Sequence, residues 1–338
     1  MHSVDKKGVL LINLGTPKSP TTEDVRVYLK EFLSDKDVIR MPRFFWLPLL
    51  NLVILRSRPA KSAELYKKVW TEWGSPLLYN TYLQAGLLKK KFDEDKIDKF
   101  FIDVAMRYGS PSIESKLLQL VKSGYKKIII LPMFPQYSTT TTRSIARKLN
   151  EIVKKNKSLD NIEINFIKDF HNHELYIDAC CESIKDFQLN SGQPQKLLLS
   201  FHGIPESYVG ADEPYRDQCI MTANLIAKKL DLDEKQFEIA FQSRFGKAEW
   251  IKPYLAERLE NLPNEKINNI QVFCPGFSSD CLETIEEIGE ESRELFLESN
   301  GKDFGFIPCL NGSEKFIRLI KDLIINCDNY SIDYRTLF

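Results

Sequence analysis

The sequence lacks the glycine-rich motifs that hold nucleotide phosphates in α/β proteins. Neither G-x-G-x-x-G nor G-x-x-x-x-G-K-[ST] occurs in the 338 residues. A nucleotide-dependent dehydrogenase and a P-loop NTPase are therefore disfavoured. The G-x-S-x-G nucleophile elbow is also missing, which argues against the usual serine hydrolase of this class.

Paired cysteines and an excess of charge are missing as well. The seven cysteines are scattered without a C-x-x-C pair, so neither a disulfide framework nor a cysteine metal cluster is predicted, and a reducing cytosol suits the chain better. The 47 Lys and Arg residues balance 47 Asp and Glu residues, so we expect no nucleic-acid partner.

No uncharged apolar run reaches the length of about 18 residues that spans a bilayer. The nearest is residues 44–55, FFWLPLLNLVIL, which Pro48 and Asn51 interrupt. It is flanked by four arginines, Arg40, Arg43, Arg56 and Arg58. Two interpretations stay open: a buried hairpin or short helix, and an exposed apolar lip that touches a membrane surface or an apolar ligand.

What the sequence does contain is a regular alternation of apolar strands and amphipathic helices. The predicted strands are residues 8–14, 100–106, 126–134 and 162–167, then 196–202, 237–242, 270–274 and 304–308. Two groups of four such strands indicate an α/β protein with two doubly wound domains and parallel sheets. The polar stretch 154–160 predicts domains at 1–155 and 160–312, with a C-terminal helix and tail, 313–338, packing back.

Histidine is scarce, and one position stands out among the four. His202 ends the apolar strand 196–202 and precedes Gly203. Open α/β sheets bind ligands at the carboxyl ends of their strands, which favours a functional role, although a histidine hydrogen-bonded beneath a loop is the alternative. His171 and His173 are interpreted as loop residues.

An acidic helix follows the strand 270–274. Glu283, Glu287 and Glu291 recur every fourth residue, a spacing that aligns along a π turn, and π turns often mark functional sites. Such a row offers a path for a divalent cation. The alternative is a capping box that joins Asp280 and Glu283, followed by a solvated acidic face.

Six segments together resemble the ferrochelatase family, in the form of its bacterial protoporphyrin branch. They are LLINLGTP (10–17), MRYGSP (106–111), LPMFPQYSTTTT (131–142), LLLSFHGIPESY (197–208), FQSRFGKAEW (241–250) and CPGFSSDCLETIEEI (274–288). The resemblance implies two Rossmann-like domains of the chelatase fold with a porphyrin cleft between them. It implies a lyase that inserts ferrous iron into protoporphyrin IX, giving protohaem and two protons, as the terminal step of haem biosynthesis.

The resemblance also assigns site residues. It implies His202 and Glu283 as catalytic residues, and His202, Glu283, Glu287 and Glu291 as metal ligands. Implied porphyrin contacts are Arg58, Tyr66, Ser75, Arg107, Tyr108, Tyr137, Ser138 and Trp250, with residues 44–55 as the lip.

The implied ligands are the two substrates, Fe²⁺ and protoporphyrin IX, with no tightly bound cofactor. Some family members ligate a [2Fe-2S] cluster just after the Tyr-Ser pair, but Thr139 stands there in this chain, so no cluster is expected. We expect a cytoplasmic protein, peripheral at the inner face of the membrane, with the preceding porphyrin-pathway enzyme as a partner. A coproporphyrin ferrochelatase, a chelatase for another metal and a non-enzymatic haem carrier remain as alternatives.

Overall fold

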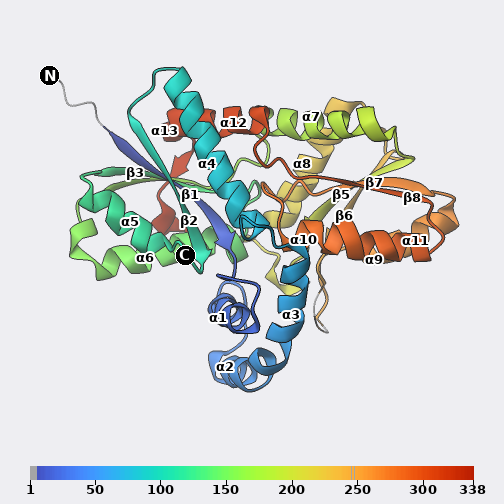
Figure 1. The fold of residues 1–338 in the computed structure, drawn as a ribbon, viewed down its shortest axis with the longest axis horizontal. Helices are drawn as coiled ribbons and strands as arrows, with labels where there is room; N and C mark the ends of the chain where they lie inside the picture. The colour runs from blue at the N-terminus through green and yellow to red at the C-terminus, as the bar shows by residue number, and fades with distance from the viewer. Residues whose placement is uncertain (1–5, 245, 247) are drawn as a thin grey trace. The chain divides into compact units, whose positions relative to one another are not determined.

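Figure 1 shows the fold in a computed structural model, which describes residues 6–244, 246 and 248–338. The chain forms two compact units. The first contains the chain up to residue 134, residues 138–169 and residues 317–338, and the second contains residues 135–137 and 170–316. Phe245 and Lys247, inside one of the segments that carry the resemblance, lie outside the described residues.

The first unit is built on a five-stranded sheet in the order β2-β1-β3-β4-β9. Its strands are β1 (Lys7–Gly15), β2 (Phe100–Tyr108), β3 (Lys127–Pro132), β4 (Glu163–Ile167) and β9 (Ser331–Ile332). The first four pair in parallel, and β9 adds a short antiparallel edge beside β4. The buried side chains of β1 face both sides of the sheet, as expected of a strand covered by helices on two faces.

Helices cover both faces of this sheet. The helices of this unit, not all of which pack on the sheet, are α1 (Thr22–Leu33), α2 (Arg43–Leu49), α3 (Leu55–Val69), α4 (Pro76–Glu94), α5 (Ile113–Lys122), α6 (Ser144–Lys155), α12 (Glu314–Ile325), which enters the unit at residue 317, and α13 (Cys327–Tyr330), with short turns η1 (Leu50–Ile54), η2 (Thr139–Arg143), η3 (Lys157–Leu159) and η7 (Tyr334–Leu337). The apolar sides of α5 and α6 form one core with Leu10, Ile12 and Ile130 of the strands. In Figure 1, α4 lies on the opposite side of this sheet from α5 and α6.

The second unit repeats the same strand order in a four-stranded parallel sheet, β6-β5-β7-β8. Its strands are β5 (Lys196–His202), β6 (Phe237–Gln242), β7 (Asn269–Phe273) and β8 (Asp303–Ile307). Its helices and turns are α7 (Glu174–Ser191), η4 (Glu206–Tyr208), α8 (Tyr215–Leu230), α9 (Leu255–Asn261), η5 (Leu262–Glu265), α10 (Leu282–Ile285), η6 (Glu287–Ser292) and α11 (Arg293–Glu298). Figure 1 shows α7 and α8 on one face of this sheet and α9 to α11 on the other.

The division between the units differs from the one expected from the polar stretch 154–160. Strand β4 pairs in parallel with β3, so the first unit continues to residue 169. The polar stretch is the turn η3 between α6 and β4, inside that unit. The tail packs back on the first unit from residue 317, because β9 pairs with β4.

The apolar segment 44–55 is helical, and it is neither fully buried nor fully exposed. It spans α2 and the π-helical turn η1. Trp46 and Leu50 are buried, and the Trp46 indole donates a hydrogen bond to the Leu33 carbonyl at 2.7 Å. The exposed apolar side chains are Phe44, Phe45, Leu47, Leu49, Leu52 and Val53. Trp46 therefore anchors this segment rather than belonging to its exposed face.

Within residues 6–244, 246 and 248–338, no helix is long and apolar enough to cross a membrane. All seven cysteines are free and buried. Burial raises the thiol pKa of Cys180 well above its usual range, as it does for Cys219 and Cys274. A buried, protonated thiol is a poor nucleophile, so these cysteines act as core residues.

Candidate active site

In the second unit the strand order reverses between β5 and β7, which creates a switch point at their carboxyl ends. His202 is the last residue of β5. The loop after β7 leads to α10, which carries Glu283, and the neighbouring β6 ends at Gln242. Three parallel strands thus deliver a histidine, a carboxylate and an amide to one edge of the sheet.

The imidazole of His202 is oriented by its own chain. Its Nδ1 lies 2.6 Å from the Gly203 carbonyl oxygen, and because a carbonyl only accepts, Nδ1 carries the proton. In the neutral ring, Nε2 then keeps its lone pair for a proton or a metal ion. The ring of Trp250 lies 6.5 Å from His202, centroid to centroid.

Residue 203 has little room for any side chain. A Cβ atom at Gly203 would lie 2.8 Å from the Gln242 carbonyl oxygen and 3.1 Å from the Trp250 ring. The Gly203 amide donates to that same carbonyl at 2.8 Å. Glycine therefore lets the chain after His202 lie close to the Gln242 backbone and the Trp250 ring.

The start of the acidic helix is fixed by Asp280. Its carboxylate accepts hydrogen bonds from the Thr284 hydroxyl and the Cys309 amide, both at 3.1 Å, and from the Asn311 side chain at 2.7 Å. The helix cap is Cys281 with Thr284. The predicted capping box of Asp280 and Glu283 is therefore wrong, and the Glu283 carboxylate is not used as a cap.

The acidic row has the predicted π geometry. Residues Glu287–Ser292 form the π turn η6 between α10 and α11, and the Glu291 amide donates to the Glu286 carbonyl five residues earlier, at 2.9 Å. Glu283 and Glu287 are half-buried, whereas Glu291 is exposed. Because the wider turn keeps every fourth residue near one side, the row runs from the interior to the surface.

Glu287 has the most specific surroundings of the three glutamates. Its carboxylate accepts a hydrogen bond from the Ser243 hydroxyl at 2.6 Å and a weaker one from the Gln242 amide at 3.4 Å. Burial raises the pKa of Glu287 above its usual value, and Glu283 raises it further, while Ser243, His202 and Gln242 lower it. His202 and Glu283 are therefore both close enough to Glu287 to affect its pKa.

These side chains form an open row and not a closed cage. Across the described part of the chain, no three His, Cys, Asp or Glu side chains converge into a site that would hold a metal ion. The four residues predicted as metal ligands are thus not gathered around one point.

Two predicted porphyrin contacts belong to this second unit. Trp250 is half-buried beside His202 and presents an aromatic face. Tyr137 is buried, and its backbone amide donates to the Gln218 side chain at 2.6 Å. Trp250 is therefore the better placed of the two to contact a ligand near His202.

In the first unit, Arg107 and Tyr108 end β2 and are held by Asp35. The Arg107 guanidinium bonds to the Asp35 carboxylate and, at 2.6 Å, to the Ser144 hydroxyl. The fully buried Tyr108 phenol donates to Asp35 at 2.9 Å. Burial opposes ionisation of Asp35, but Arg107, Ser144, the Asp37 amide and Tyr108 together lower its pKa. This geometry argues against direct contact between Tyr108 and a substrate.

The remaining predicted contacts are spread over the first unit. Arg58 and Tyr66 lie on α3, where Tyr66 packs edge-to-face on Tyr28 with centroids 6.4 Å apart. Burial lowers the pKa of Arg58. Ser75 is buried at the start of α4, and the Ser138 hydroxyl caps η2 by accepting from the Thr140 amide. Ser138 therefore has a structural role already.

Sequence reasoning missed Gln242, Ser243 and Asp35. Gln242 bonds to both the Glu283 carbonyl and the Glu287 carboxylate, and Ser243 adopts a positive φ of 67° that turns the chain after β6. The available signal was the position of Gln-Ser at the end of a predicted parallel strand. Asp35 gave no comparable signal, because it lies in a loop whose partners are distant in sequence.

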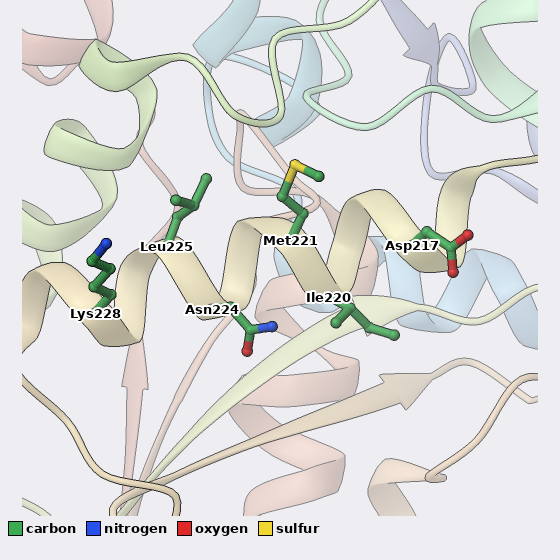
Figure 2. A pocket seen from close by; sticks show the side chains of 6 residues that line it. All are labelled: Asp217, Ile220, Met221, Asn224, Leu225 and Lys228. Atoms are coloured by element: carbon green, nitrogen blue, oxygen red, sulfur yellow. The ribbon is translucent and has the colours of Figure 1, made fainter.

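A surface depression of the second unit lies away from these residues. Figure 2 shows its lining side chains, which all come from α8: Asp217, Ile220, Met221, Asn224, Leu225 and Lys228. A hollow lined by one helix has no polar groups converging from different elements. We therefore place the candidate site at the β5–β7 switch point.

Comparison with known proteins identifies the family of this chain. A family model described as ferrochelatase matches residues 6–327. Ferrochelatase from Aromatoleum aromaticum is 44% identical over 95% of this chain and 87% of its own length. Ferrochelatase from Pseudoalteromonas atlantica is 42% identical over 95% of this chain and 88% of its own length.

Solved structures show the fold. SirB from Bacillus subtilis, determined with Fe³⁺, aligns over 97% of this chain and all of its own with a TM-score of 0.54 at 14% identity. The multi-domain protein DR2241 from Deinococcus radiodurans aligns over 98% of this chain and 56% of its own with a TM-score of 0.54 at 10% identity. Both support the chelatase fold, and the extent of the sequence matches establishes that the chain belongs to the ferrochelatase family, enzymes that insert a metal ion into a porphyrin.

Proposed function

We propose that this enzyme inserts Fe²⁺ into protoporphyrin IX, giving protohaem and two protons in the terminal step of haem biosynthesis. The observation that carries the proposal is the grouping of His202, Glu283 and Glu287 at the switch point of the second sheet, in a chain of the ferrochelatase family. Metallation needs proton acceptors and ligands for a borderline divalent ion, and imidazole and carboxylate serve as both.

His202 and Glu283 are the proposed catalytic residues. As each pyrrole N–H bond breaks, its electron pair goes to the iron and its proton goes to a nearby base. The Nε2 of His202 has a lone pair for this role because Nδ1 is already bonded to Gly203. The Glu283 carboxylate is held on a helix start that Asp280 fixes, and it contacts the Cys281 thiol, whose pKa is raised by burial and by Glu283.

Glu287 and Glu291 are proposed to conduct iron inward and protons outward. Glu291 is exposed, and Glu287 is half-buried with a raised pKa caused chiefly by burial. A carboxylate whose pKa lies nearer neutrality exchanges protons more readily at physiological pH. The row therefore offers oxygen ligands to the incoming ion and acceptors to the departing protons.

The porphyrin contacts remain a proposal. Trp250 offers a stacking face beside His202. The Arg107 guanidinium is paired with Asp35 and Ser144, and its remaining N–H groups are the proposed donors to a propionate. Arg58, Tyr66, Ser75, Tyr137 and Ser138 complete the proposed set. Tyr108 is reassigned to support Arg107, because its phenol is buried against Asp35.

We propose that the protein is cytoplasmic and associates peripherally with the inner face of the membrane. The exposed side chains of α2 and η1 supply an apolar face, on which Phe44 is 72% and Phe45 is 63% exposed. Burial at about 25 cal/mol per Å² makes a few such side chains sufficient for reversible attachment. Protoporphyrin partitions into membranes, so a membrane-bound enzyme meets its substrate there. The preceding pathway enzyme is a proposed partner as well, because it supplies the protoporphyrin that partitions into the membrane.

We also propose that the enzyme needs no resident cofactor. Thr139, at the position where some relatives ligate a [2Fe-2S] cluster, is buried, and a hydroxyl is a poor ligand for iron–sulfur chemistry. Elemental analysis of protein purified anaerobically would test this: more than trace iron and sulfide bound to the chain would contradict it.

The direct test of function is an anaerobic assay of purified protein with Fe²⁺ and protoporphyrin IX, followed by the haem absorption spectrum. Parallel reactions with coproporphyrin and with Co²⁺ or Ni²⁺ separate the proposed activity from the alternative chelatases. A non-enzymatic haem carrier would bind added haem but form none. Haem formation that is fastest with Fe²⁺ and protoporphyrin supports the proposal.

A further inference from the structure

A pocket in the first unit lies outside the residues assigned to catalysis or porphyrin binding. It is formed by the loop between α1 and α2 and by the chain around the start of α6. Its lining residues are Lys36, Asp37, Ile39, Arg40, Met41, Arg143 and Arg147. The pocket therefore joins two segments about a hundred residues apart in sequence.

The charge of this pocket is strongly unbalanced. Four basic side chains line it against the single carboxylate of Asp37, which leaves a formal excess of three positive charges. The whole chain, by contrast, has a formal net charge of zero. The nearby carboxylate of Asp35 is already paired with Arg107. A local excess of this size attracts anions.

Asp37 makes the pocket a built site and not a loose patch of charge. Its side chain is 2% exposed, and it holds Arg147 through two bonds, at 2.6 and 2.9 Å, and Arg143 at 3.1 Å. A guanidinium has five N–H donors, so Arg147 keeps donors beyond the two that Asp37 takes. Fixed guanidinium groups are well suited to the oxygens of a phosphate group.

The surroundings of the pocket indicate where such a phosphate comes from. Met41, part of the lining, is 47% exposed, and the exposed face of α2 with Phe44 and Phe45 follows directly in the chain. Lys36 is exposed at the pocket edge. Basic residues beside an exposed apolar helix are the arrangement that meets headgroups and acyl chains together.

We propose that this basic pocket binds the phosphate group of an anionic phospholipid. Only the lipid source of the phosphate rests on the membrane association proposed above; the anion site itself rests on the pocket. Arg143, Arg147 and Arg40 contact the phosphate oxygens, Lys36 contributes long-range attraction, and α2 contacts the acyl region.

The test is co-sedimentation of the full chain with vesicles of phosphatidylcholine alone or with about one third phosphatidylglycerol. The variant is Lys36→Gln with Arg40→Gln, which leaves the buried Asp37 pairs intact. Each charge removed near an anionic surface weakens binding about fivefold, so the double variant is expected to bind the mixed vesicles about 25-fold more weakly. Its binding to phosphatidylcholine alone and its iron insertion with detergent-dispersed porphyrin are expected to match wild type.

The matched control is Lys122→Gln with Lys155→Gln, which removes two exposed charges from the same unit outside the pocket. Equal losses in the two double variants, or no preference of wild type for phosphatidylglycerol, would overturn the proposal. So would tight, Arg40-dependent binding of inorganic phosphate without any vesicle preference, which would make free phosphate the ligand. If wild type ignores phosphatidylcholine but keeps a pocket-dependent affinity for mixed vesicles, the apolar membrane contact fails and the anion site stands.

Discussion

The two units have the same strand order but differ in how the polar side chains at the ends of their strands are paired. In the first unit, Arg107 at the end of β2 is neutralised by Asp35 and bonded to Ser144. In the second unit, His202 ends β5 and Glu283 lies in the helix after β7, and we propose that Nε2 of His202 takes part in the reaction. The shared fold places both sets of side chains at the edge of a sheet. We expect the paired set in the first unit to stabilise the structure and the set in the second unit to carry out the chemistry.

The largest expected effect is the loss of turnover when His202 in the second unit is replaced. We predict that His202→Ala lowers kcat by about 10²- to 10⁴-fold, the range for losing a positioned proton acceptor, without changing the circular dichroism spectrum. His173→Ala is the control, because His173 caps α7 by accepting from the Leu175 amide. That variant is expected to lose about 1 kcal/mol of stability and keep its turnover. Near-normal turnover of folded His202→Ala would show that His202 is not a catalytic residue.

The second effect is a loss of stability when the Asp35 network in the first unit is broken. Asp35→Asn leaves the Arg107 charge buried without its partner, which costs about 3–5 kcal/mol of unfolding free energy. Denaturant titration measures it, with Lys89→Gln as control, since its exposed pair with Asp93 contributes less than about 1 kcal/mol. If Asp35→Asn is as stable as the control, the network in the first unit is not structural support.

The pH dependence of stability follows from the same carboxylate. The pKa of Asp35 is lower in the folded protein than its ordinary value. Its contribution is therefore present above the unfolded-state pKa and is lost as the pH falls through the folded-state pKa. Wild type is expected to lose stability in acid more steeply than Asp35→Asn does; parallel acid titrations of the two proteins would contradict this.

A third, graded effect concerns the acidic row. Glu283→Gln is expected to lower kcat most, because Glu283 lies nearest the strand end, whereas Glu287→Gln and Glu291→Gln mainly raise the apparent KM for iron. Glu294→Gln, exposed on the following helix α11, is the control. Steady-state kinetics over a range of Fe²⁺ concentrations measures all four. If the three row variants behave like the control, the row is a solvated face.

The smallest effect tests how Ser243 changes the pKa of Glu287. The Ser243 hydroxyl lowers the pKa of Glu287 against the opposing effect of burial. Removing it in Ser243→Ala should raise that pKa further, so activity that needs the ionised carboxylate appears at higher pH. The acid limb of the kcat/KM profile is expected to move upward, with Ser299→Ala, at the far end of α11, as control. An unmoved limb would show that Glu287 does not titrate in the reaction.

The sequence by itself determined what depends on local pattern. Apolar runs bounded by turns located all eight parallel strands, the position of His202 after a buried run placed it at a strand end, and the spacing of Glu283, Glu287 and Glu291 anticipated the π turn. Each of these features follows from residues close together in the chain, whose periodicity reports local conformation directly.

Only the tertiary structure decided which distant groups meet. It assigned β4 to the first sheet, buried Trp46 while leaving Phe45 exposed, and enclosed Tyr108 against Asp35. These outcomes depend on hydrogen bonds and ion pairs between segments that are tens of residues apart, and no local periodicity encodes such partners. A polar group is buried where it has a hydrogen-bond or ion-pair partner. The burial of such a residue therefore cannot be predicted until its partner is known.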